Sequence, residues 1–78
     1  MDIETINEEA IGDVLWRVAL FRGNNRTMIA YLWARDANMA EEYAYEESQG
    51  RFDNGDELVI ENVETGVEVS LTMEGSTQ

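Results

Sequence analysis

The chain contains no cysteine and no histidine, and all five of its basic residues are arginine, so lysine is absent too. Without cysteine, neither disulfide bonds nor thiolate metal sites are available. Without histidine, the commonest general base and metal ligand is missing. No apolar run approaches the ~20 residues of a membrane-spanning helix, and the acidic N-terminus does not resemble a secretory signal. We therefore expect a cytoplasmic protein with no cofactor, metal or membrane partner.

Acidic residues dominate what is present. Seventeen Asp and Glu face five Arg, which gives a net charge of -12 on 78 residues. Self-repulsion on this scale destabilises a small compact domain, so the excess needs an explanation. Nucleic acid and anionic membranes would be repelled, whereas a basic protein would be attracted. High salt, which screens the repulsion, is the other setting that tolerates such a surface.

The segment 14–35, VLWRVALFRGNNRTMIAYLWAR, holds both tryptophans and predicts a β-hairpin, because Gly and Asn at its centre favour tight turns. If Asn24-Asn25 forms a two-residue turn, Trp16 pairs with Trp33. The other pairs on that face are Arg22 with Thr27, Leu20 with Ile29 and Val18 with Tyr31. An alternative is a helix over Asn7–Arg22 that ends at Gly23, because several apolar residues also match helical spacing.

Residues 36–49 have the clearest helical pattern, with Asp36 or Asn38 as the N-cap and Gly50 as a left-handed stop. Its narrow apolar stripe consists of Met39, Ala40, Tyr43 and Ala44. Residues 57–74 alternate between apolar and polar and predict a second hairpin that turns at Thr65-Gly66. Its expected buried pairs are Asn62 with Val69, Ile60 with Leu71 and Leu58 with Met73, while Glu61 and Ser70 face outward.

The remaining segments are an N-terminal arm or short helix over residues 1–13 and a tail over 75–78. Thr5 and Glu8 fit a capping box, and Ile3, Ile6 and Ile11 could fold the arm onto the sheet. The predicted order is β-β-α-β-β in a single domain. This is an α+β fold with a four-stranded antiparallel sheet and one helix on a face. The first hairpin is apolar on both faces, so we expect the arm or a second copy in a homodimer to cover the other side.

Catalytic and metal-binding patterns are weak in this sequence. The hydroxyl groups of Ser48, Ser70, Thr27 and Thr72 have no nearby base, so we expect no enzymatic activity. The loop Asp53–Glu57 offers oxygen ligands, but its spacing does not match a calcium-binding EF-hand. We interpret it as a solvated loop rich in turn-forming residues.

The glutamates of the helix are the sharper signal. Carboxylates on successive helical turns lie ~6 Å apart, which is similar to the spacing of phosphates along a nucleic-acid strand. The helix and the loop after it could therefore present a phosphate-like row to a basic groove, with an exposed Tyr as an anchor. The candidate partner-binding residues are Glu41, Glu42, Tyr45, Glu46, Glu47, Asp53, Asp56 and Glu57. The alternative is a solvated face that keeps the protein soluble.

Residues 26–48, RTMIAYLWARDANMAEEYAYEES, show a strand that runs into a helix start marked by Asp36, Ala37, Ala40, Glu41 and Ala44. Together with small size and acidity, this pattern resembles phage-encoded anti-CRISPR proteins of the DNA-mimic type. The resemblance implies a non-enzymatic inhibitor that blocks the basic DNA-binding site of a CRISPR effector complex in the host cytoplasm. That group shares no motif, so no residue role follows from it. The alternative is a small acidic domain of a halophilic organism with a structural or adaptor role through dimerisation.

Overall fold

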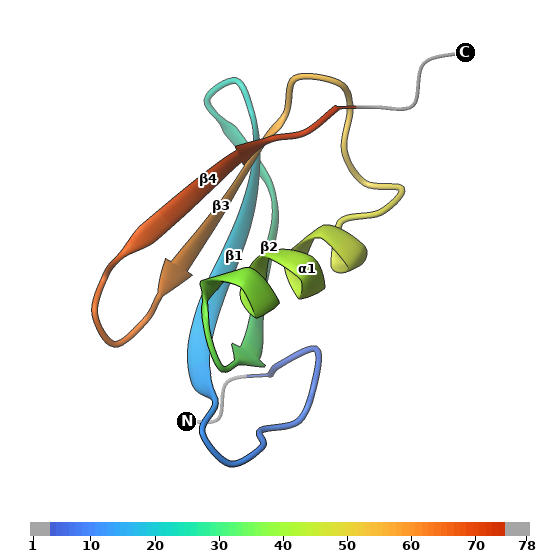
Figure 1. The fold of residues 1–78 in the computed structure, drawn as a ribbon. Coiled ribbons are helices and arrows are strands. Elements are labelled where there is room, and N and C mark those ends of the chain that lie inside the picture. Colours follow the sequence, from blue (N-terminus) through green and yellow to red (C-terminus); the bar gives the residue numbers. More distant parts are fainter. Residues whose placement is uncertain (1–3, 75–78) are drawn as a thin grey trace.

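A computed structural model of the protein describes residues 4–74, so the predicted tail and Ile3 lie outside the described residues. The elements are β1 (Val14–Arg22), β2 (Asn25–Ala34), α1 (Ala37–Glu47), β3 (Glu57–Asn62) and β4 (Glu68–Thr72). The strands form one antiparallel sheet of order β2-β1-β3-β4, and α1 lies on one of its faces (Figure 1). The predicted α+β class and the predicted element order are therefore confirmed, and the alternative helix over Asn7–Arg22 is wrong.

The hydrophobic core lies between α1 and the face of the sheet that it covers. Its largest fully buried apolar side chains are Leu20, Leu32, Leu58, Ile60, Met73 and Val18. Ala34 of β2 and Ala40 and Ala44 of α1 are also fully buried, and small side chains of this kind let a helix pack closely on a sheet. The Trp16 indole N–H satisfies its hydrogen bond in this core by donating to the Ala34 carbonyl at 3.1 Å.

The N-terminus of α1 follows the predicted cap, whereas its C-cap is Ser48, two residues before the predicted stop at Gly50, which does have a left-handed φ of +80°. Asp36 is the N-cap, and its Oδ1 accepts a hydrogen bond from the Met39 N–H at 2.9 Å. At the other end, the N–H of Ser48 bonds back to the Ala44 carbonyl, and its hydroxyl donates to the Tyr45 carbonyl at 2.9 Å. The hydroxyl of Ser48 is thus satisfied although the residue is fully buried. The helix is slightly shorter than the predicted range of 36–49.

The first hairpin turns one residue earlier than predicted. Arg22 pairs with Asn25, so the two-residue loop is Gly23-Asn24 rather than Asn24-Asn25. Gly23 has a φ of +63°, which a type II′ turn requires of its first loop residue and which only glycine adopts without steric cost. The predicted pairs next to this turn are therefore wrong by two positions.

A β-bulge at Thr27 follows this turn. Phe21 pairs with Arg26 and Leu20 with Met28, so Thr27 has no partner residue in β1. Its hydroxyl donates to the Leu20 carbonyl at 3.2 Å. Beyond the bulge, β2 lies one position from its predicted register, and a shift of one residue exchanges the two faces of a strand.

This exchange of faces separates the aromatic side chains that the sequence predicted on one face of the hairpin. Trp16 is buried under α1 opposite Leu32, whereas Tyr31 and Trp33 are half-buried on the other side of the sheet. The prediction that Trp16 and Trp33 share a face is therefore wrong. In the observed register β2 contributes the fully buried Leu32 and Ala34 to the side under α1, so it brings no aromatic ring there.

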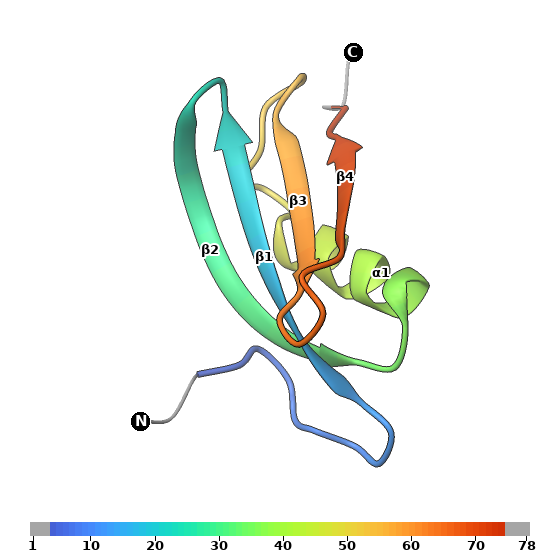
Figure 2. The same ribbon diagram turned by 90° about the vertical axis from the view of Figure 1, so that its left-hand side faces the viewer.

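We call the side of the sheet away from α1 the open face. From the pairing and the alternation of side chains, its residues are Leu15, Arg17, Ala19, Phe21, Arg26, Ile29, Tyr31, Trp33, Glu57, Val59, Glu61, Glu68, Ser70 and Thr72. Figure 2 looks onto this face, and among the described residues no helix or strand lies over it.

The second hairpin keeps its predicted faces but not its predicted partners. Leu58 pairs with Leu71 and Ile60 with Val69, which is two positions away from expectation. A shift of two residues leaves every side chain on the same face. Leu58 and Ile60 are accordingly fully buried, as predicted.

A longer loop than expected causes that shift. The loop covers residues 63–67, whereas the prediction placed a two-residue turn at Thr65-Gly66. Oδ1 of Asn62 accepts hydrogen bonds from the N–H groups of Glu64 and Thr65 at 2.9 and 3.1 Å. This side-chain-to-backbone turn holds the loop in place of a tight hairpin.

The N-terminal arm contains no helix over residues 4–13, so the predicted capping box at Thr5 is not formed. The Thr5 hydroxyl instead donates to the Asn7 carbonyl at 2.7 Å. Ile11 is 97 % exposed, and its predicted packing on the sheet is therefore wrong.

The arm is joined instead to the outer edge of β2. Both polar atoms of the Asn7 amide bond to Trp33: Nδ2 donates to its carbonyl and Oδ1 accepts from its N–H, each at 2.8 Å. The Ile6 N–H donates to the Tyr31 carbonyl at 2.9 Å. The arm thus occupies one end of the sheet edge and does not cover the open face.

Candidate functional site

The helical acids that we predicted as a row are divided around α1. Because an α-helix has 3.6 residues per turn, Glu42 and Glu46 stack on its outer surface, and both are exposed. Glu41 projects on another side and is half-buried, while Glu47 lies toward the sheet. The continuous part of the predicted row is therefore the pair Glu42 and Glu46.

One of the helical glutamates has a counter-charge. The carboxylate of Glu47 lies 3.8 Å from the guanidinium of Arg51, one turn further along. Among the described residues no such ion pair is formed by Glu41, Glu42 or Glu46. Their unbalanced negative charge makes the surface of α1 attractive to a cationic partner.

Tyr45 lies beside this acidic surface, as expected, with 44 % of its area exposed. Its ring contacts that of Phe52 at a centroid distance of 6.0 Å and an interplanar angle of 42°. Phe52 in turn packs against the core. The contact holds Tyr45 in place, so it could anchor a partner without a large loss of side-chain entropy.

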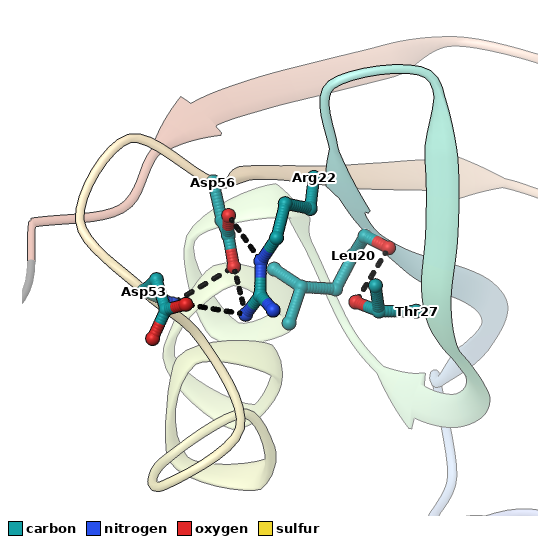
Figure 3. Close-up of polar contacts among 5 residues, drawn as sticks. All are labelled: Leu20, Arg22, Thr27, Asp53 and Asp56. Atoms are coloured by element: carbon teal, nitrogen blue, oxygen red, sulfur yellow. Dashed lines mark hydrogen bonds and ion pairs between the residues drawn. The ribbon is translucent and has the colours of Figure 1, made fainter.

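Asp56 lies elsewhere and has a different role from the one predicted. Its carboxylate is 3 % exposed and binds the Arg22 guanidinium through two hydrogen bonds of 3.1 and 3.2 Å (Figure 3). It also accepts the N–H of Asp53 at 2.8 Å. The hydrogen bonds from Arg22, followed by that from the Asp53 N–H, hold the pKa of Asp56 below its usual value. Asp56 is therefore already occupied and cannot meet a partner without breaking these bonds.

The loop around Asp56 is shaped by a turn and by Arg22. The Asp56 N–H bonds to the Asp53 carbonyl at 3.1 Å, and Gly55 between them has a φ of +95°, as a type II turn requires. Asp53 is exposed, but its carboxylate lies 3.1 Å from Arg22. Arg22 therefore offsets part of the charge that Asp53 would offer to a partner.

Glu57 is exposed but belongs to the open face, because it pairs with Phe21 and Thr72 there. It lies on the other side of the sheet from α1. The structure therefore does not bring the eight candidate residues into one surface. Glu41, Glu42, Tyr45 and Glu46 share α1, whereas Asp56 is buried and Glu57 faces away.

A shallow groove of about 390 Å³ runs between α1 and the arm. Tyr43, Glu46 and Glu47 line one side, and Ile6 and Asn7 line the other. Sequence reasoning did not find this groove, because it depends on the bonds between Asn7 and Trp33. Among the described residues, no cluster of acidic side chains has the geometry of a metal site.

No helix among the described residues is both long and apolar enough to cross a membrane. The chain matches no protein-family model, and no curated protein or solved structure is significantly similar to it.

Proposed function

We propose that the protein is a non-enzymatic inhibitor that occupies a basic, nucleic-acid-binding surface of another protein. The observation that carries this proposal is the set of three helical glutamates, Glu41, Glu42 and Glu46, without an ion-pair partner among the described residues. Like charges one turn apart destabilise a helix by a few tenths of a kcal/mol. A cationic partner would remove that repulsion on binding.

The resemblance to acidic anti-CRISPR proteins makes a CRISPR effector complex the first candidate partner. Binding would follow the electrostatics of nucleic-acid mimicry: the net charge of -12 steers association, and Tyr45 supplies an apolar anchor. Such binding weakens as salt rises, because the charges are exposed and screened.

The test compares two variants with the same change of net charge. E41K/E42K/E46K reverses the helical acids, and E9K/E64K/E74K reverses three exposed acids on the arm, a loop and the end of β4. Lys has a helix propensity similar to that of Glu, so the first variant should remain folded. Each tagged protein is used to capture partners from a bacterial lysate, and captured proteins are challenged with double-stranded DNA.

We expect the wild type and the E9K/E64K/E74K variant to capture a nucleic-acid-binding protein that DNA displaces. E41K/E42K/E46K should lose it. Equal capture by both variants would contradict the assignment of the site to α1. Inhibition of CRISPR interference in cells, measured with the same variants, tests the more specific partner.

A second candidate, a small domain adapted to high salt, is favoured by one observation. Acidic residues occur on the arm, the loops, β3 and β4 and not only on α1, with exposed examples in Glu8, Asp53, Glu64 and Glu68. Thermal melts in dilute buffer and in molar salt separate the two. A salt-adapted domain should unfold in dilute buffer, whereas an inhibitor that acts in an ordinary cytoplasm should stay folded.

A further inference from the structure

The open face has an apolar half and an acidic half. Phe21, Ile29, Tyr31 and Trp33 come from β1 and β2, whereas Glu57, Glu61 and Glu68 come from β3 and β4. Ile29 is 45 % exposed, and none of the four apolar residues packs against the core under α1. Exposed apolar surface beside charge is typical of an interaction site rather than of a simply solvated face.

The acidic half is only partly neutralised. Arg17 lies 2.6 Å from Glu61 across the β1–β3 pair. Glu57 and Glu68 form no such ion pair with a described residue. Two carboxylates of this face therefore form no ion pair within the described part of the chain.

Glu57 and Glu68 lie at the two ends of a shallow hollow of about 450 Å³. Val59 and Ser70 line it between them, while Phe21, which pairs with Glu57, and the turn residues Gly23 and Asn24 complete the lining. Glu68 pairs with Glu61, four residues along β3 from Glu57, so the carboxylates are separated by ~13 Å along the strands. The hollow thus combines the apolar side chains of Phe21 and Val59 with two glutamates set apart along the strands.

We propose that this hollow binds an extended segment of a basic partner protein, with Lys or Arg at positions i and i+4 and an apolar residue at i+2. In a strand these three side chains share one face and have the same ~13 Å span. Basic side chains can lay their aliphatic stems on Phe21 and Val59 while their heads meet Glu57 and Glu68. A second copy of this chain is a poor occupant, because each copy carries a charge of -12.

This surface lies on the opposite side of the sheet from the acids of α1, so it is independent of the proposed function. The probe is a capped heptapeptide, Gly-Lys-Thr-Leu-Thr-Lys-Gly, compared with a shuffled peptide of the same composition in which the two lysines are adjacent. Binding to the ¹⁵N-labelled protein is followed by NMR titration. Matched variants are E57K/E68K on the open face and E42K/E46K on α1.

We expect the first peptide to shift the amide signals of β1, β3 and β4 around the hollow and to bind more tightly than the shuffled one. E57K/E68K should weaken binding about tenfold or more, because like charges then face each other, and E42K/E46K should not. Equal binding of the two peptides, or equal losses in the two variants, would overturn the proposal. So would a dimer in sedimentation experiments that Ile29→Asp dissociates, because a second copy would then occupy this face.

Discussion

The two faces of the sheet are built from the same four strands but differ in how tightly their residues are constrained. Under α1, Leu20, Leu58 and Ile60 are completely buried, together with alanines of β2 and of the helix itself. On the open face, Phe21 and Val59 are half-buried beside exposed glutamates. Close packing therefore restricts which side chains the face under α1 can carry. The side chains of the open face are less restricted and can serve to bind a partner. The bulge at Thr27 decides which residues of β2 belong to each.

The largest expected effect on the folded state comes from deleting one residue of β2. Deleting Tyr31 either moves Leu32 and Ala34 to the open face or removes the bulge and takes Met28 out of the core. Both outcomes destroy the packing under α1, so we expect loss of cooperative unfolding. Deleting Thr27 leaves Met28 opposite Leu20 in a regular ladder, and this variant should fold. Circular dichroism and NMR spectra of the two deletions test the claim, and a folded Tyr31 deletion would contradict it.

Neighbouring substitutions in β3 sharpen the contrast between the faces. Leu58→Ala removes a fully buried side chain and should cost about 2–5 kcal/mol in the free energy of unfolding. Val59→Ala, on the half-buried open face, should cost below about 1 kcal/mol, given ~0.8 kcal/mol for each methylene that is fully buried. Urea unfolding measures both. Similar losses for the two would mean that the open face is covered.

The Arg22–Asp56 pair makes the stability of the fold depend on pH. The pKa of the Asp56 carboxyl is lowered in the folded state. Asp56 therefore adds stability above its unfolded pKa of about 3.9. That stability is lost as the pH falls through the lower folded pKa. Asp56→Asn should lower the melting temperature at pH 7, and the difference from wild type should shrink as the pH falls below about 4. Melting curves over this range test it, with Asp53→Asn as the exposed control. A difference that is constant with pH would contradict it.

The smallest expected effect concerns the arm. Asn7→Ala removes two hydrogen bonds to Trp33, and each is worth about 0.5–1.5 kcal/mol at most, because water can replace them at a partly exposed site. The clearer readout is hydrogen exchange at the Trp33 N–H, which should become faster, while the Leu20 N–H within the core stays protected. Unchanged exchange at Trp33 would show that the arm is not attached there.

The sequence predicted the kind and order of the elements, because alternation and caps are local signals. The caps of α1 at Asp36 and the buried faces of β3 are examples. It did not predict the register of the first hairpin, because Gly23-Asn24 and Asn24-Asn25 are both acceptable turns. The bulge at Thr27 has no signature in composition, and its position depends on what fits under α1.

The candidate site was less predictable than the fold. Asp56 looked like a solvated loop acid, but its partner Arg22 is 34 residues away in the chain, and no local pattern reveals such a pair. Glu57 was predictable, since alternation with the buried Leu58 already places it away from α1. The helical acids were identified, but their division around α1 follows only from helical geometry and from the position of the sheet.

The two hydrogen bonds between the Asn7 amide and the Trp33 backbone affect how readily the protein can aggregate. An edge strand as long and apolar as β2 offers unpaired backbone groups on which further chains could add and grow into fibrils. Asn7 occupies both the donor and the acceptor of Trp33, and Ile6 occupies the Tyr31 carbonyl. An incoming strand therefore finds both backbone groups of Trp33 and the carbonyl of Tyr31 already bonded, so the arm hinders strand addition at the most aromatic end of that edge.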